Sequence, residues 1–168
     1  MPPRGVNSRS TVFKGINVRL LDLIAHRDGL GTLCGDIGNA LIIAKRLEKV
    51  YAIAGPEFGD RQDCVMILNK ALYGLRSSSR AFRGHFAEFL RSMGFRPTRY
   101  DRDVWMRLRE AKDGYDYICT HVDDFKVVAR NPEQWIDKIK AGFLLKHVGP
   151  PNYYLGNDYR WNDNLGLY

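Results

Sequence analysis

Residues 115–129 read YDYICTHVDDFKVVA, two runs of aromatic and β-branched residues on either side of the pair Asp123-Asp124. Such runs are typical of β-strands and Asp is favoured in turns, so the stretch predicts a hairpin with both carboxylates at its tip. Strands on both sides would hold the two side chains in place. An Asp pair between strands is also an ordinary solvated turn, so this stretch alone does not decide the function.

A third carboxylate, Asp36, lies far upstream in the run LCGDI of residues 33–37, at the end of another predicted strand. Three convergent carboxylates favour a two-metal phosphoryl-transfer site. Nucleotidyl transfer uses two divalent ions about 3.5–4 Å apart, and Asp is a usual hard-oxygen ligand for Mg²⁺. A site of this kind would use Mg²⁺, with Mn²⁺ as a substitute, and the spacing permits Asp36 to join Asp123 and Asp124 in it without showing by itself that it does.

Further segments follow one another in a recognisable order. They read DIGNAL at 36–41, VY at 50–51, GPEFG at 55–59, KALYGLR at 70–76, RAF at 80–82, MGF at 93–95, D and DVW at 101 and 103–105, VDD at 122–124, VGPP at 148–151 and YYLG at 153–156. From about Val18 to Tyr159 this series resembles the reverse transcriptase of copia-type long-terminal-repeat retrotransposons.

The resemblance implies an RNA-directed DNA polymerase whose palm carries Asp36, Asp123 and Asp124 as catalytic metal ligands. It also implies that the incoming deoxynucleoside triphosphate meets the residues after Asp36, namely Ile37, Gly38, Asn39, Ala40 and Leu41. Expected partners are an RNA or DNA template-primer, the triphosphate and other parts of a retrotransposon polyprotein. The expected location is the cytoplasm, in virus-like particles.

Three positions depart from the family pattern. Leu41 stands where an aromatic residue is usual, Ser77-Ser78-Ser79 replace Gln-Ala-Pro, and His121 replaces Tyr before Val-Asp-Asp. These departures favour an alternative, a catalytically degenerate remnant that binds nucleic acid without turnover, although His121 is also compatible with a plain surface position on a strand. A two-metal nuclease is a third reading, which gives no reason for the segments at 70–76 and 149–156.

Periodicity and turn residues predict an α+β fold. We expect a palm-like antiparallel sheet, with helices on one face and the other face open to a template-primer. The expected helices cover 16–26, a short stretch from Asn39, 77–93 and a segment beginning at 131–133, and the expected strands end at Asp36 or cover 49–53, 65–68, 104–109, 115–122 and 125–129. Phe82, Phe86 and Leu90 recur every four residues, which indicates a core stripe.

The chain has 168 residues, 45% of them hydrophobic, which suits one domain. We expect a flexible segment at 1–14 and a partial reverse transcriptase domain at 15–168, with fingers and thumb incomplete, so that the chain is a fragment. The net charge of +7 favours a polyanionic partner, although basic proteins without one are common.

The remaining composition gives two further expectations. Cys34, Cys64 and Cys119 are far apart and have no His at ligand spacing, which argues against a zinc site or a disulfide framework. The sequence has no run of roughly 18 apolar residues, so we expect an intracellular protein without a membrane span.

Overall fold

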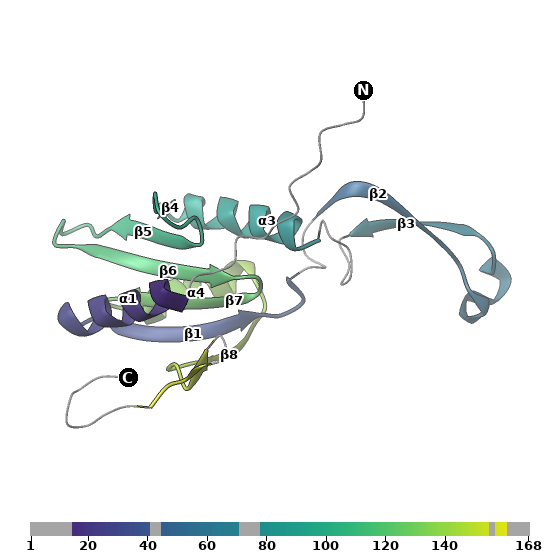
Figure 1. Cartoon of the computed structure of the whole chain (residues 1–168). Helices are drawn as coiled ribbons and strands as arrows, with labels where there is room; N and C mark the ends of the chain where they lie inside the picture. Colours follow the sequence, from purple (N-terminus) through teal and green to yellow (C-terminus); the bar gives the residue numbers. More distant parts are fainter. Residues whose placement is uncertain (1–14, 41–44, 71–77, 155–156, 161–168) are drawn as a thin grey trace. The chain divides into compact units, whose positions relative to one another are not determined.

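The computed structural model describes residues 15–40, 45–70, 78–154 and 157–160 (Figure 1). The flexible segment predicted at 1–14, residues 161–168 and most of the short helix expected after Asn39 lie outside these residues. Contacts divide the chain into two compact units. The first contains the described residues between 39 and 87, and the second contains residues 15–38 and the described residues from 88 onward. The domain boundary at residue 15 stays a prediction.

The elements follow one another in an α+β order. They are α1 (Gly15–Arg27), β1 (Gly31–Ile37), β2 (Lys45–Ile53), η1 (Pro56–Arg61), β3 (Val65–Lys70), α3 (Ser78–Ser92), β4 (Arg96–Pro97), β5 (Val104–Leu108), β6 (Tyr115–His121), β7 (Asp124–Ala129), α4 (Pro132–Gly142), β8 (Leu145–Gly149), β9 (Tyr153–Tyr154) and β10 (Asn157–Asp158). Among the described residues, no helix is both long and apolar enough to cross a membrane.

The first unit contains the antiparallel hairpin of β2 and β3, with Val50 opposite Leu68 and Ile53 opposite Val65. The strands expected at 49–53 and 65–68 are confirmed, and β2 begins earlier, at Lys45. The loop between them holds the 3₁₀ turn η1, which begins at Pro56. Proline suits the start of a helical turn because it lacks a backbone N–H that would need a partner.

Helix α3 confirms the prediction for 77–93 to within one residue at each end. Its core stripe is buried, with Phe82, Phe86 and Leu90 at most 3% exposed. The helix ends because Gly94 adopts φ +87°, which glycine tolerates. Gly94 N then donates to Arg91 O at 2.9 Å and Phe95 N donates to Leu90 O at 3.1 Å, which closes the helix in a Schellman motif.

The second unit is built on a six-stranded sheet in the order β4-β5-β6-β7-β1-β8. Every neighbouring pair in it is antiparallel. The predicted hairpin of residues 115–129 forms β6 and β7 and lies in the middle of this sheet. In β7 the residues from Phe125 to Ala129 are all buried, as in a strand covered on both faces.

The expectation that helices cover one face of the sheet is wrong for this unit. Cys119 of β6 packs in a buried cluster with Val18 and Leu21 of α1, whereas Asp116 of the same strand bonds to Trp135 of α4. Side chains three positions apart on a strand point to opposite faces, so α1 and α4 lie on opposite sides (Figure 1). The face expected to receive a template-primer is therefore partly covered by α1.

Helix α4 begins where the sequence predicted, with the Asn131 side chain accepting a hydrogen bond from Gln134 N at 3.3 Å and Pro132 at the first helical position. The indole ring of Trp135 in this helix meets the Phe95 ring edge-on, with 4.9 Å between ring centroids. Phe143, just after the helix, meets Phe89 of α3 in the same way, also at 4.9 Å. These aromatic contacts form the core on the α4 side of the sheet.

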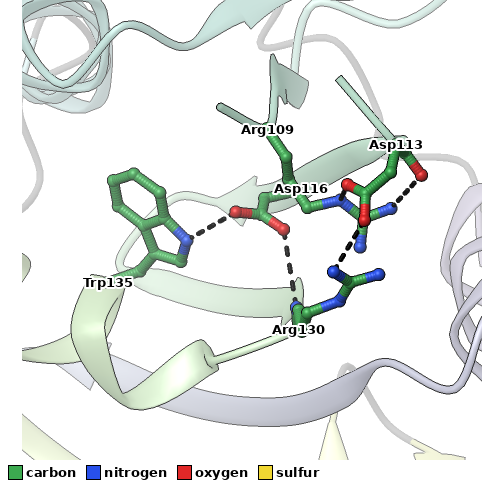
Figure 2. A network of polar contacts seen from close by, with 5 residues as sticks. All are labelled: Arg109, Asp113, Asp116, Arg130 and Trp135. Carbon is green, nitrogen blue, oxygen red and sulfur yellow. Dashed lines mark hydrogen bonds and ion pairs between the residues drawn. The ribbon is translucent and has the colours of Figure 1, made fainter. Parts of the chain in front are cut away.

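A polar network ties α4 to the hairpin of β5 and β6 (Figure 2). Asp116 is 3% exposed and accepts hydrogen bonds from Trp135 Nε1 at 3.0 Å and Arg130 N at 3.5 Å. Next to it, Asp113 pairs with Arg109 Nε at 3.2 Å and with an Arg130 guanidinium nitrogen at 2.6 Å. The buried carboxylate thus supports the indole N–H, while the second carboxylate bridges two arginines.

Replacing Asp116 by alanine is expected to lower the free energy of unfolding by about 1–3 kcal/mol, because the buried indole N–H of Trp135 loses its acceptor. The measurement is equilibrium urea denaturation. Asp113→Asn is the control, since its carboxylate is more exposed and such ion pairs contribute about 0–1 kcal/mol. Equal losses of unfolding free energy in both variants would show that the hydrogen bond from Trp135 to Asp116 stabilises the fold no more than the ion pairs of Asp113 do.

Candidate catalytic site

The turn between β6 and β7 consists of Val122 and Asp123 and presents the paired carboxylates as predicted. His121, the last residue of β6, is the Cα partner of Asp124, the first residue of β7. Val122 has φ +53°, a conformation that is unfavourable for a β-branched residue. The two flanking strands are the centre of the sheet, so this tight turn is held on both sides.

Asp36 is brought to this turn by the pairing of β1 with β7. Asp36 and Asp124 are directly opposite each other in the antiparallel register. Residues opposite each other on one face have Cβ atoms about 4.5–5.5 Å apart. Ile37 N donates to Asp123 O at 2.8 Å, so the pairing continues into the turn. The three predicted catalytic residues therefore lie together at one end of the sheet.

The pKa values of two of these carboxyls are raised by their surroundings. Burial and then the charges of Asp123 and Asp36 raise the pKa of Asp124, while His121 opposes the shift. Burial and then Asp123 raise the pKa of Asp36, with Lys146 and His147 opposing it. The ionised carboxylates repel one another, which is an environment that favours a bound cation.

Carboxylate oxygens are the donors that Mg²⁺ and Mn²⁺ prefer, so the chemistry of this donor set fits such an ion. Over the described ranges, no three His, Cys, Asp or Glu side chains are gathered closely enough to hold one metal ion. The backbone thus brings the three carboxylates to one place, while their side chains do not enclose a common point.

Asparagine at position 36 or 124 is expected to raise the free energy of unfolding at neutral pH in the presence of a chelator. A raised pKa means that the folded state binds the proton more tightly than the unfolded chain does. Stability is therefore lost as the pH rises through and above the ordinary Asp range, and removing the charge restores it. Urea denaturation of each variant at neutral and acidic pH measures this, with Asp137→Asn on the exposed face of α4 as the control.

The residues after Asp36, to which the resemblance assigns the nucleotide, differ in how far their backbone N–H groups and side chains are exposed. Ile37 is 1% exposed, and its N–H is engaged by Asp123 O. Gly38 N donates to Leu144 O at 2.8 Å, and a Cβ at Gly38 would lie 2.9 Å from Lys146 Cε. Both backbone N–H groups already have partners. Asn39 is exposed with φ +58°, Ala40 is buried, and both belong to the first unit, while Leu41 lies outside the described residues.

Lys146 of β8 is a basic residue at this site that sequence reasoning missed. It is exposed and is the Cα partner of Asp36. Nothing local marks it, because Lys146 follows an ordinary helix end and its place beside Asp36 comes from long-range strand pairing. The register of β8 thus adds a positive charge next to Asp36.

The comparisons with known proteins agree with the resemblance noted above. Residues 6–165 match the family model described as reverse transcriptase (RNA-dependent DNA polymerase). The chain belongs to the reverse transcriptase family. It is similar to the Retrovirus-related Pol polyprotein from transposon RE1 of Arabidopsis thaliana, with 27% identity over 152 residues, which is 88% of this chain and 10% of that protein.

Other members of the family show the same degree of similarity. The Retrovirus-related Pol polyprotein from transposon TNT 1-94 of Nicotiana tabacum is 27% identical over 153 residues, covering 88% of this chain and 11% of that protein. The polyprotein from transposon RE2 of Arabidopsis thaliana is 26% identical over 152 residues. This reverse transcriptase chain spans about a tenth of the length of these relatives. No solved structure matches it.

Proposed function

We propose that the chain supplies the polymerase palm of a copia-type reverse transcriptase and adds deoxynucleotides to a primer 3′-hydroxyl on an RNA template. The observation that carries this proposal is the register that sets Asp36 opposite Asp124, together with the hydrogen bond from Ile37 N to the backbone oxygen of Asp123. Carboxylates that are distant in sequence meet at the end of one sheet, within the range matched by the family model.

In this proposal Asp36, Asp123 and Asp124 hold two divalent ions. When bound, such ions activate the attacking hydroxyl and neutralise charge on the phosphoryl and leaving oxygens. The protein's contribution is to fix the carboxylates on paired strands, so that little reorganisation is needed as charge develops. Lys146, beside Asp36, supplies a cation for the phosphates of the incoming triphosphate. The assignment of the nucleotide site to the residues that follow Asp36 rests on the family resemblance.

A second candidate is a remnant that binds nucleic acid without turnover. Three observations favour it. The N–H groups of Ile37 and Gly38 already have backbone partners, so neither is free to bind a triphosphate. Within the described part of the chain, the carboxylates also do not form a closed metal-binding group. The third is His121, which places a basic side chain beside Asp124.

The test is extension of a labelled DNA primer annealed to an RNA template, with all four deoxynucleoside triphosphates and Mg²⁺ or Mn²⁺. Extension that stops with a chelator and returns with excess Mg²⁺ supports the polymerase. Binding of the template-primer without extension supports the remnant. Shortening of the primer when nucleotides are omitted would instead indicate a nuclease. Other parts of a Pol polyprotein are the proposed partners, and adding them in trans tests whether they restore activity.

A further inference from the structure

The loop between β4 and β5 presents an exposed aromatic ring between two cations. Tyr100 is 95% exposed, and its neighbours Arg99 and Arg102 are exposed as well. We call these three residues the Tyr100 surface. The Tyr100 ring belongs neither to the core nor to the carboxylate site, so neither of them accounts for its exposure.

Hydrogen bonds within the loop and one from α1 hold its backbone and its carboxylate in place. Thr98 Oγ1 donates to Asp101 O at 2.7 Å, and Asp101 N donates to Thr98 Oγ1 at 3.2 Å. Asp103 N donates to Asp101 Oδ1 at 2.9 Å, and Asn17 of α1 donates to Asp101 Oδ2. A loop fixed in this way presents its outward side chains with little entropy left to lose on binding.

Charge in the loop is sorted between its two sides. Both oxygens of Asp101 accept hydrogen bonds from the protein, and Asp103 is 7% exposed. The negative side chains therefore face the protein, whereas Arg99 and Arg102 face solvent. The outward side is positive although the loop sequence contains two carboxylates and two guanidinium groups.

The loop lies at the same end of the six-stranded sheet as the candidate catalytic turn. Thr120 N donates to Asp103 O at 2.8 Å, and Thr120 directly precedes His121 and the turn. β5 and β7 are separated by one strand, β6, so they are about 10 Å apart at strand spacings of about 4.8 Å. A strand of nucleic acid at the carboxylates would reach the loop within a few nucleotides.

We propose that the Tyr100 surface binds an unpaired segment of a nucleic-acid strand, with a base stacked on the Tyr100 ring and phosphates paired with Arg99 and Arg102. The identification of that strand as the template next to the polymerase site rests on the proposed function. Aromatic stacking combined with cations that follow the backbone is the general means of binding single strands without sequence preference. A protein partner fits less well, because stable protein interfaces have a larger apolar centre and the loop offers one ring.

The test measures the affinity of the full chain for a short fluorescein-labelled oligouridylate by fluorescence anisotropy, with a blunt duplex of equal length as comparison. Tyr100→Ala is expected to weaken oligouridylate binding about tenfold, because one base loses the ring on which it stacks, while Tyr100→Phe keeps the ring and retains the affinity. The double variant Arg99→Ala with Arg102→Ala is expected to make the slope of log K against log salt concentration less steep. The slope should change by about 0.7 for each lost phosphate contact. The blunt duplex should be little affected by loss of the Tyr100 ring.

Matched controls lie away from the loop. Tyr115→Ala removes a partly exposed ring at the far end of β6, and Lys140→Ala removes an exposed cation from α4, so neither should change oligouridylate affinity. Unchanged affinity of Tyr100→Ala would overturn the inference. So would a loss of self-association in that variant, measured by sedimentation, together with unchanged RNA binding, because the partner would then be a second copy.

The outcome separates this inference from the polymerase proposal. Binding that depends on Tyr100 in a chain that never extends a primer supports the Tyr100 surface and contradicts the polymerase. Extension by the wild type with full activity and full affinity in Tyr100→Ala supports the polymerase and overturns the Tyr100 surface. Binding measurements need no turnover, so the two results are independent.

Discussion

Asparagine at Asp123 or Asp124 is expected to reduce primer extension by at least about 10³-fold, while the affinity for the template-primer changes little. Removing a single group that stabilises developing charge costs about 10²–10³ in rate, and losing central phosphoryl-transfer groups costs more. Asn keeps the shape of Asp and removes the charge that a divalent ion requires. The measurement is Mg²⁺-dependent extension of a labelled DNA primer on an RNA template, in single-turnover conditions.

Two controls separate a lost site from a lost fold. Asp137→Asn removes an exposed carboxylate on α4 and should extend primers like the wild type. Urea denaturation of Asp124→Asn should show a protein at least as stable as the wild type in chelator, because the raised pKa of that carboxyl makes its charge unfavourable. Extension at the wild-type rate by both Asp variants would rule out these carboxylates as the catalytic groups.

Local signals in the sequence predicted the hairpin of β6 and β7 and the start of α4. The first depends on β-branched and aromatic runs around an Asp pair, and the second on an Asn-Pro start signal. Both are decided by neighbours along the chain. The meeting of Asp36 with Asp124 was expected only from the family resemblance, because strand pairing across more than eighty residues leaves no local mark.

The sequence did not show that helices cover both faces of the six-stranded sheet. A period of two tells which residues share a face, but not which helix covers that face. Val18 and Leu21 of α1 pack on the side of Cys119, opposite Trp135. The mostly apolar run at residues 125–129 is a signal for coverage on both faces, but Lys126 interrupts it, and a lysine in a strand normally indicates a solvent-exposed position. The departures at Leu41 and Ser77 lie outside the described residues, so their effect on the site stays a prediction.

Lys126 is 0% exposed. Because of this burial, we expect Asp22→Ala and Lys126→Met to lower the free energy of unfolding by very different amounts. Its ammonium pairs with the Asp22 carboxylate of α1 and lies 4.7 Å from the centroid of the Tyr159 ring and 5.9 Å from that of Tyr154. Tyr159 Oη also donates to Asp22 Oδ2 at 3.3 Å. Asp22→Ala leaves a buried cation without its counter-charge, so it is expected to lower the free energy of unfolding by about 3–5 kcal/mol.

Lys126→Met is expected to cost much less than Asp22→Ala, about 1.5 kcal/mol or below, because methionine fills similar space without a charge. Asp22 keeps the hydrogen bond from Tyr159 and some contact with water, since its side chain is 22% exposed. Urea denaturation of both single variants and of the double variant measures the coupling. The double variant should be more stable than Asp22→Ala alone, because the unpaired charge is gone. Additive losses in the double variant would mean that Asp22 stabilises α1 by contacts other than this ion pair.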